Sequence, residues 1–481
     1  MTDHLMSLPL ERDTRRGDER PFRFYIASLG CPKNTVDSSN MAVLLQRAGY
    51  APTLDSGQAD ILIVNTCGFI DAARQESLET MQALAAGLRP NQRLVAAGCW
   101  AQREPDVLLD AIPQLDAVLG TRTWNDIVSV AEALLNETGG SIARDTTRLR
   151  RIANTAVTLP EAAGAPGFVI SGPSAFLKVA DGCSRTCAFC AIPAIKGATV
   201  SRPISAVLED ARQLQALGVL EINLIAQDVT YYGRDMGLQD GLAALLEQML
   251  VEIPDVPWLR LLYAFPGFVT PRLIDVIAQS PQVLPYIDIP LQHAHPEVLR
   301  RMRRPADIDS VRRLVADLRT AIPDIALRTT FIVGFPGETE AQFLTLLDFV
   351  NAMHFDRVGV FTYSHENGTA AAQLPDDVSP EAKEERREAL MLTQQSISRR
   401  KNSAFIGKRL EVLLEATGDG ITVGRSYRDA PEVDGVVLIR EELRPNRLVT
   451  VKITEALEYD LIGRVTRTHP RGNPRGGRAQ Q

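Results

Sequence analysis

The stretch DGCSRTCAFCAIP, residues 181–193, decides the fold of the middle part of this 481-residue chain. It places Cys183, Cys187 and Cys190 in one short loop that follows a strand-forming run. This spacing lets three thiolates face one four-iron cluster, whose fourth iron stays open for a small molecule. Zinc is the alternative, but it needs a fourth protein ligand, for which His293 or His295 is the candidate. The spacing and its position after a strand favour an iron–sulfur cluster.

The other three cysteines are spread over the first hundred residues, and each follows a short apolar run. They are separated by 36 (67 − 31) and 32 (99 − 67) residues, and each interval is about one βαβ unit long. Because parallel strands end at the same edge of a sheet, these cysteines can meet there. Three separate buried cysteines are the alternative, and the repeated placement favours convergence. The expected strands and the cysteines after them are 23–29 with Cys31, 61–64 with Cys67 and 94–97 with Cys99.

Periodicity and composition predict an α/β protein with three folded parts. The middle part contains six βα units, which are too few for an eight-unit barrel and predict a partial, open one. The last part has short strand runs with turns between them and predicts a small all-β barrel. The expected boundaries are 1–20 for a disordered N-terminus, 21–140 for the first domain, 141–172 for a linker, 173–402 for the partial barrel, 403–468 for the all-β barrel and 469–481 for a disordered basic tail.

Charge and hydropathy argue against a nucleic-acid-binding, secreted or membrane-spanning protein. The net charge of −7 argues against a general basic footprint for nucleic acid. The first twenty residues have no apolar core of a signal peptide, and no run of about twenty apolar residues predicts a membrane span. We therefore expect a cytoplasmic protein with reduced thiols, in which cysteine spacing points to metal binding or catalysis.

Two further motifs lie near predicted strand ends of the middle part. GFPGE, residues 334–338, follows a strand and precedes a helix, so Gly334, Gly337 and Glu338 are candidates for contact with a ligand. Phe189 stands just before the last cysteine of the loop and is a candidate to shield a cluster or stack on a base, although ordinary packing is its alternative.

Histidines and arginines follow the predicted strand at 286–289. His293 and His295 are not assigned to proton transfer, because the sequence gives no geometry for it. For most of the basic residues a solvated helix face is the better interpretation. These basic residues are Arg300, Arg301, Arg303 and Arg304.

These motifs resemble those of a known family. CSRTCAFC resembles the CxxxCxxC signature of radical S-adenosylmethionine (SAM) enzymes. SLGCPKN, NTCGF and AGC resemble the first domain of the methylthiotransferases, and the last segment resembles their TRAM domain. SLGCPKN, DIPLQHA, FIVGFPGETE and GRSYRDAPEVDG are similar to the ribosomal-protein branch, the RimO-type aspartate methylthiotransferases. The resemblance covers nearly all of residues 22–467. The sister branch acts on tRNA and reads nearer GCQMN at its first cysteine.

The resemblance implies a flavodoxin-like first domain, a partial (β/α)6 radical SAM barrel and a TRAM barrel. It implies two 4Fe–4S clusters, each held by one set of three cysteines, and a SAM site near Phe189, Gly334, Gly337 and Glu338. The implied activity is a transferase that methylthiolates the β-carbon of an aspartate in ribosomal protein S12, giving 3-methylthioaspartate. No catalytic residue beyond the cluster ligands is assigned.

The implied partners are ribosomal protein S12, held through the TRAM domain, an electron donor and a sulfur donor, with a weak ribosomal RNA contact and no membrane. Methylthiolation of isopentenyl-adenosine in tRNA is the alternative, and an RNA-binding factor with structural clusters is a third class. Residues 408–467 contain ten basic and eleven acidic residues, and this balance favours a protein substrate.

Overall fold

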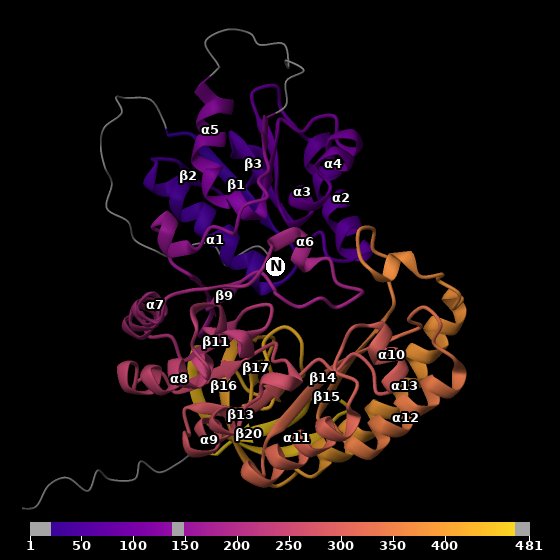
Figure 1. The fold of residues 1–481 in the computed structure, drawn as a ribbon. Coiled ribbons are helices and arrows are strands. Elements are labelled where there is room, and N and C mark those ends of the chain that lie inside the picture. Colours follow the sequence, from indigo (N-terminus) through magenta and orange to yellow (C-terminus); the bar gives the residue numbers. More distant parts are fainter. Residues whose placement is uncertain (1–20, 137–148, 467–481) are drawn as a thin grey trace, which may run out of the picture.

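The computed structural model of the chain describes residues 21–136 and 149–466, which form three folded parts in sequence order (Figure 1). The expected disordered ends, 1–20 and 469–481, and the first residues of the expected linker lie outside the described residues. None of the described helices is long and apolar enough to cross a membrane.

The first domain is a parallel sheet with helices on both faces. Strand β3 consists of buried residues throughout, as expected where helices cover both sides of a sheet. The strand order β2-β1-β3-β4-β5-β6 contains the 2-1-3-4-5 order of flavodoxin-like folds, which confirms the predicted class. The strands are β1 Arg23–Ser28, β2 Ala51–Pro52, β3 Ile61–Thr66, β4 Arg93–Gly98, β5 Ala117–Gly120 and β6 Leu149–Arg151, and the helices are α1 Pro32–Arg47, α2 Asp71–Ala86, α3 Cys99–Arg103, α4 Pro105–Ala111 and α5 Ile127–Asn136.

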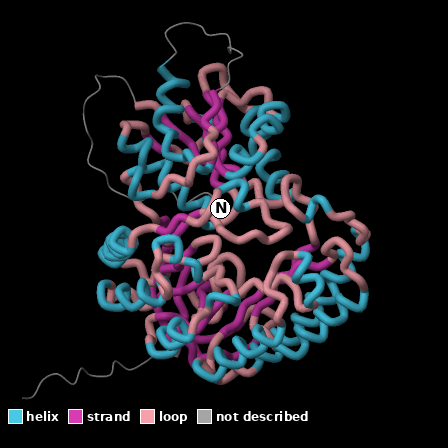
Figure 2. The backbone as a smooth tube through the Cα atoms, viewed as in Figure 1, coloured by secondary structure: helices cyan, strands magenta, loops and turns pink. Residues whose placement is uncertain are grey.

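The central part is the predicted partial barrel. Its sheet has the order β15-β14-β13-β12-β11-β8-β7, in which β7 alone is antiparallel to its neighbour, and helices cover its outer face (Figure 2). The sheet is formed by β7 Phe168–Ser171, β8 Ser174–Lys178, β11 Glu221–Ile225, β12 Trp258–Leu261, β13 Val283–Asp288, β14 Ala326–Val333 and β15 Arg357–Thr362, with a small pair of β9 Ala180–Asp181 and β10 Val200–Ser201. The helices are α6 Ile192–Lys196, α7 Ile204–Ala216, α8 Gly241–Glu252, α9 Pro271–Gln279, α10 Pro296–Arg301, α11 Ile308–Ala321, α12 Glu340–Met353 and α13 Pro380–Ser403.

The C-terminal barrel is closed, with the order β16-β17-β18-β20-β19, and this confirms the predicted all-β fold. The expected linker is partly built into the neighbouring sheets, because β6 joins the first domain and β7 joins the central barrel. The strands of the C-terminal barrel are β16 Arg409–Gly418, β17 Ile421–Arg425, β18 Val437–Ile439, β19 Arg447–Ala456 and β20 Leu461–Val465.

The interior of the central barrel is filled from both ends. One apolar cluster joins strand residues such as Phe176 and Tyr286 to Val36 of α1 and to Leu413 and Ala430 of the C-terminal barrel. An open sheet of six parallel strands leaves apolar surface that it cannot cover alone, so the neighbouring domains complete its core. Residues of the neighbouring domains are therefore part of the core of the central barrel.

Buried ion pairs fix the C-terminal barrel to the amino ends of the central strands. The Glu221 carboxylate accepts hydrogen bonds from Arg260 Nε at 2.8 Å, from Arg425 Nη1 at 3.2 Å and from Ser174 Oγ at 2.7 Å. Burial alone would raise the pKa of Glu221, but the two guanidinium groups hold it far below its ordinary value. This carboxylate therefore stays ionised in the folded protein.

The segment GRSYRDAPEVDG, residues 424–435, contains Arg425 and supplies further buried contacts to the central barrel. Asp429 accepts a hydrogen bond from Arg357 at 2.6 Å, and Asp434 accepts one from the Tyr286 hydroxyl at 2.7 Å. Several of its side chains are buried, so the segment holds the barrels together. A partner of the C-terminal barrel would therefore contact other, exposed residues of that barrel.

We expect Arg425→Met to lower the free energy of unfolding by about 3–5 kcal/mol, because it leaves buried acidic groups short of a cation. Arg440→Met is the matched control, since Arg440 pairs with Glu455 at an exposed position and such pairs contribute about 0–1 kcal/mol. Urea unfolding followed by circular dichroism measures both variants. Equal midpoints for the two variants would contradict the structural role of this ion pair.

Candidate functional site

Cys31, Cys67 and Cys99 converge at the carboxyl edge of the first sheet. Cys31 precedes α1, Cys67 follows β3 and Cys99 opens α3. A Cβ atom added at Gly30 would lie 3.0 Å from the Cys67 sulfur, and one added at Gly68 would lie 2.9 Å from the Cys99 carbonyl carbon. The three loops therefore pack directly on one another, as the repeated strand–cysteine pattern predicts.

Cys183, Cys187 and Cys190 lie in one loop after β9, at the carboxyl edge of the central barrel. The Cys183 amide donates to the Gly197 carbonyl at 3.0 Å, and the Cys190 amide donates to the Cys187 carbonyl at 3.2 Å. Gly182 has φ +74°, and a Cβ there would lie 2.2 Å from the Ala198 carbonyl oxygen. The turn before Cys183 thus requires glycine.

The loop that carries the second cysteine set contacts the first domain beside Cys99. Cys99 packs against Ala191 and Ile195, which lie one and five residues after Cys190. The Arg122 guanidinium of the first domain donates to the Ile195 carbonyl at 2.8 Å and to the Ala194 carbonyl at 2.7 Å. The loop that carries one cysteine set is therefore bound to the domain that carries the other.

The donor chemistry of both sets fits iron–sulfur clusters. Burial raises the pKa of Cys99 and of Cys190 to about 12, so cluster assembly must displace their protons. Among the described residues, no three His, Cys, Asp or Glu side chains are grouped closely enough to hold one metal ion. In a cluster each cysteine binds a different iron, so three thiols can be ligands at a wider spacing.

A buried cluster of four charged side chains joins the two domains beside the cysteines. The Lys196 ammonium donates to Asp37 and to Asp181, each at 3.0 Å, and Lys178 also pairs with both carboxylates, at 3.0 Å for Asp181. Asp37 lies on α1 after Cys31, Asp181 lies just before Cys183, and Lys196 ends α6 after Cys190. All four are at most 3% exposed. Burial alone would raise the pKa of Asp181, but the two ammonium groups hold it well below its ordinary value.

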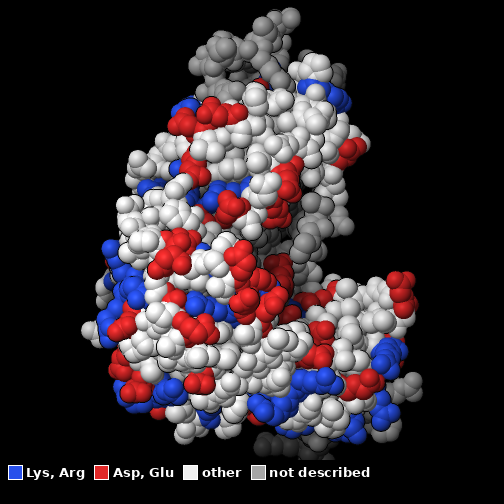
Figure 3. Space-filling view, turned by 90° about the vertical axis from the view of Figure 1, so that its right-hand side faces the viewer, with Lys and Arg blue, Asp and Glu red and all other residues white. Residues whose placement is uncertain are grey.

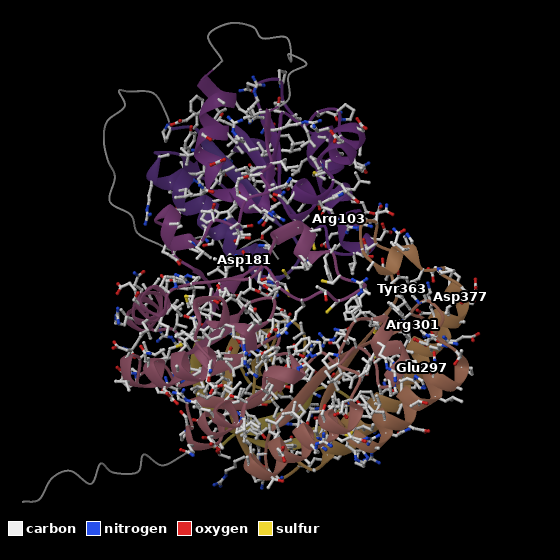
Figure 4. All side chains as sticks on the ribbon, in the orientation of Figure 1. Arg103, Asp181, Glu297, Arg301, Tyr363 and Asp377 are labelled. Carbon is white, nitrogen blue, oxygen red and sulfur yellow. The ribbon has the colours of Figure 1, made fainter. Side chains whose placement is uncertain are left out.

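A second ionic contact holds the domains together at another point of the boundary. Glu366 accepts hydrogen bonds from Arg103 Nη1 at 2.9 Å and from the Asp71 amide at 3.1 Å, and it also pairs with Arg74. Figure 4 shows Asp181 and Arg103 at two separate places along the boundary. Two separated contacts restrict rotation of one domain against the other.

Two cations near the cysteine loops have positions that the sequence did not predict: Lys33 was not noted, and Arg304 was interpreted with its neighbours as part of a solvated helix face. The Lys33 ammonium lies 3.5 Å from the centre of the Tyr263 ring, and Arg304 Nη1 lies 3.8 Å from the Cys187 sulfur. Two features of the sequence could have indicated these buried charges. Charged residues stand close to the cysteines in the sequence, and Lys178 ends the otherwise apolar strand β8.

The GFPGE turn lies at the carboxyl end of β14. Gly334 and Gly337 have φ +69° and +75°, so their backbone conformations favour glycine. Glu338 is 3% exposed and accepts a hydrogen bond from Arg386 Nη1 at 3.0 Å. Its carboxylate therefore fixes the turn, and its contact with SAM stays a prediction. Phe189 packs beside the apolar cluster around Phe335 and Tyr363, and its predicted role toward a ligand is likewise untested.

The structure gives both histidines local structural roles. His293 is fully buried, with Nε2 3.5 Å from Glu338, and its Nδ1 accepts a hydrogen bond from the His295 amide at 2.9 Å. His295 caps α10 by accepting from the Glu297 amide. Of the four arginines after them, Arg300 and Arg303 are exposed, whereas Arg301 and Arg304 are partly buried, with Arg301 bound to the Gly337 carbonyl at 3.0 Å.

We expect Asp37→Asn to loosen the boundary between the two cysteine sets, because it leaves an excess positive charge buried between Lys178 and Lys196. Breaking such a buried network costs about 3–5 kcal/mol. Hydrogen exchange of α1 and α6 should become faster. Asp106→Asn is the control, because its ion pair with Arg150 is exposed. Unchanged exchange in the Asp37 variant would contradict this role.

Comparison with known proteins agrees with this architecture. Residues 23–120 match the description "Uncharacterized protein family UPF0004", residues 177–350 match the radical SAM superfamily, and residues 406–466 match the TRAM domain. Among solved structures, the radical SAM methyltransferase TsrM from Kitasatospora setae is similar in fold, with a TM-score of 0.54 and 14% identity over 84% of this chain and 81% of that chain.

Curated relatives match almost end to end. The ribosomal protein uS12 methylthiotransferase RimO of Roseiflexus castenholzii is 48% identical, covering 92% of this chain and 96% of the relative. The protein of the same name from Herpetosiphon aurantiacus is 45% identical, covering 92% of this chain and all of the relative. With this identity over the whole length and all three domains present, the chain belongs to the RimO family of radical SAM methylthiotransferases.

Proposed function

We propose that this enzyme methylthiolates the β-carbon of an aspartate in ribosomal protein S12, giving 3-methylthioaspartate. The observation that carries the proposal is the direct packing of Cys99, from one cysteine set, against Ala191 beside the other set. Relatives that match over their whole length are named for the same protein substrate. A substrate side chain that enters between the sets can thus be reached from both.

The two sets divide the chemistry. When bound, the clusters and SAM supply the radical that removes a hydrogen atom and the methylthio group that replaces it. We assign Cys183, Cys187 and Cys190 to the radical side, because they stand at the functional edge of the barrel. Cys31, Cys67 and Cys99 then hold the sulfur side. The ionic cluster around Asp37 and Lys196 fixes the distance between the sides, and the apolar contact at Cys99 excludes water.

The SAM side of the site is proposed to include Phe189 and the turn of Gly334, Gly337 and Glu338. Glu338 would act through its hold on the turn, since its carboxylate is already bound to Arg386 and faces His293. The glycines would let the ligand approach the backbone closely. The reaction also needs an electron donor and a sulfur donor as transient partners.

A protein substrate is favoured over tRNA by the distribution of charge. On the face shown in Figure 3, acidic side chains gather around the hollow between the upper and lower parts of the molecule. Nucleic acid binding instead needs basic groups that neutralise phosphates. The mass of ribosomal protein S12 from cells with and without the enzyme tests the proposal, and an unchanged mass with modified tRNA would overturn it.

Replacing Cys183, Cys187 and Cys190 together by Ala should leave about half of the iron and abolish SAM cleavage, because each set is assigned one cluster. Replacing Cys31, Cys67 and Cys99 by Ala should leave SAM cleavage intact and abolish sulfur insertion. Iron analysis and chromatography of 5′-deoxyadenosine measure both. Methylthiolated product from the second variant would refute the division of roles.

Gly337→Val should weaken SAM binding, because a branched side chain is strained at φ +75° and would displace the turn. Iron content should stay unchanged, since no cysteine is altered. Equilibrium dialysis with labelled SAM measures the affinity of the variant for SAM. A folded variant with normal SAM affinity would leave this turn with a purely structural role.

A further inference from the structure

Lys33 is a buried cation that lacks an anionic partner. It is 9% exposed, and its ammonium stands over the Tyr263 ring, 3.5 Å from the centroid. No hydrogen bond or ion pair joins its ammonium to another residue within 21–136 or 149–466. Lys178 and Lys196, by contrast, each pair with two carboxylates. A buried ammonium is costly unless an anion or hydrogen-bond acceptor compensates it, so Lys33 calls for a further partner.

Lys33 lies at the boundary between the first domain and the central barrel. It lies two residues after Cys31 and three before Val36, whose side chain joins the apolar interior of the central barrel. The first turn of α1 therefore enters the barrel mouth. Its ammonium reaches Tyr263, which follows β12 of the central barrel, so the side chain crosses from the first domain to the carboxyl edge of the barrel.

Tyr263 is held under the ammonium by an unusual backbone conformation. It follows β12 at the carboxyl edge of the barrel and has φ +66°, in the left-handed region. For a tyrosine this conformation is strained, and such strain persists where the surroundings require it. Its ring supplies a cation–π contact, which attracts the ammonium without neutralising its charge. The ammonium is thus oriented and remains available to an anion.

The acceptor side chain brings a suitable anion. We propose that Lys33 binds the side-chain carboxylate of the acceptor aspartate and selects it over asparagine; this inference rests on the proposed function. The carboxylate carbon is bonded directly to the β-carbon, so fixing the carboxylate also places the reacting carbon. With Lys33 two residues from Cys31, that carbon is brought to the sulfur side of the site.

The test uses enzyme reconstituted with its clusters, without reductant, so that binding is measured and no turnover occurs. Wild-type enzyme should bind ribosomal protein S12 about 10- to 100-fold more tightly than an S12 variant whose acceptor aspartate is replaced by asparagine. Lys33→Met should lose this preference, and Lys33→Arg should retain part of it. Arg272→Met, which removes an exposed cation on α9, is the control and should keep the full preference.

Iron content and SAM cleavage of the Lys33 variants separate substrate binding from support of the cluster. Retained iron and cleavage with a lost preference support the inference. Lost iron with a retained preference overturns it, as does equal binding of the two S12 forms by wild-type enzyme, a comparison that needs no enzyme variant. If S12 has the same mass in cells with and without the enzyme, the proposed function itself fails. If S12 is modified but the Lys33→Met enzyme still prefers aspartate over asparagine, only the role of Lys33 fails.

Discussion

The buried cluster of Asp37, Lys178, Asp181 and Lys196 is the constraint on which the arrangement of this enzyme depends. The charges of the two aspartates and the two lysines cancel, and all four side chains are buried between the first domain and the central barrel. The attraction between such charges compensates their desolvation only when the geometry is well satisfied, so the cluster tolerates one relative placement of the domains. Because its members flank Cys31, Cys183 and Cys190, that placement also sets the separation of the two cysteine sets.

The partial barrel explains why three domains are joined so firmly. Its open sheet would expose apolar side chains at both ends, and Val36 covers one end while Leu413 and Ala430 cover the other. The C-terminal barrel is fixed further by the Glu221 network at the amino ends of the strands. The cysteines lie at the opposite, carboxyl edge. The C-terminal barrel is thus attached at one end of the central barrel, and the cysteines lie at the other.

Much of the fold followed from local patterns. The expected strands at 61–64 and 94–97 correspond closely to β3 and β4, because buried parallel strands are continuous apolar runs bounded by polar residues. The prediction of a linker at 141–172 missed β6 and β7, because these short strands form by pairing with neighbouring strands of the two sheets.

The sequence by itself determined the family, the fold classes and the grouping of the six cysteines into two sets, because motifs and the repeated order of strand and cysteine carry this information. Only the tertiary structure decided which side chains the charged groups meet. Lys33 with Tyr263, Asp37 with Lys196, and Glu221 with Arg425 are each separated by more than a hundred residues. It also assigned the 424–435 segment to barrel attachment. Such pairings have no local signature, since whether a charge is buried depends on which distant surface packs over it.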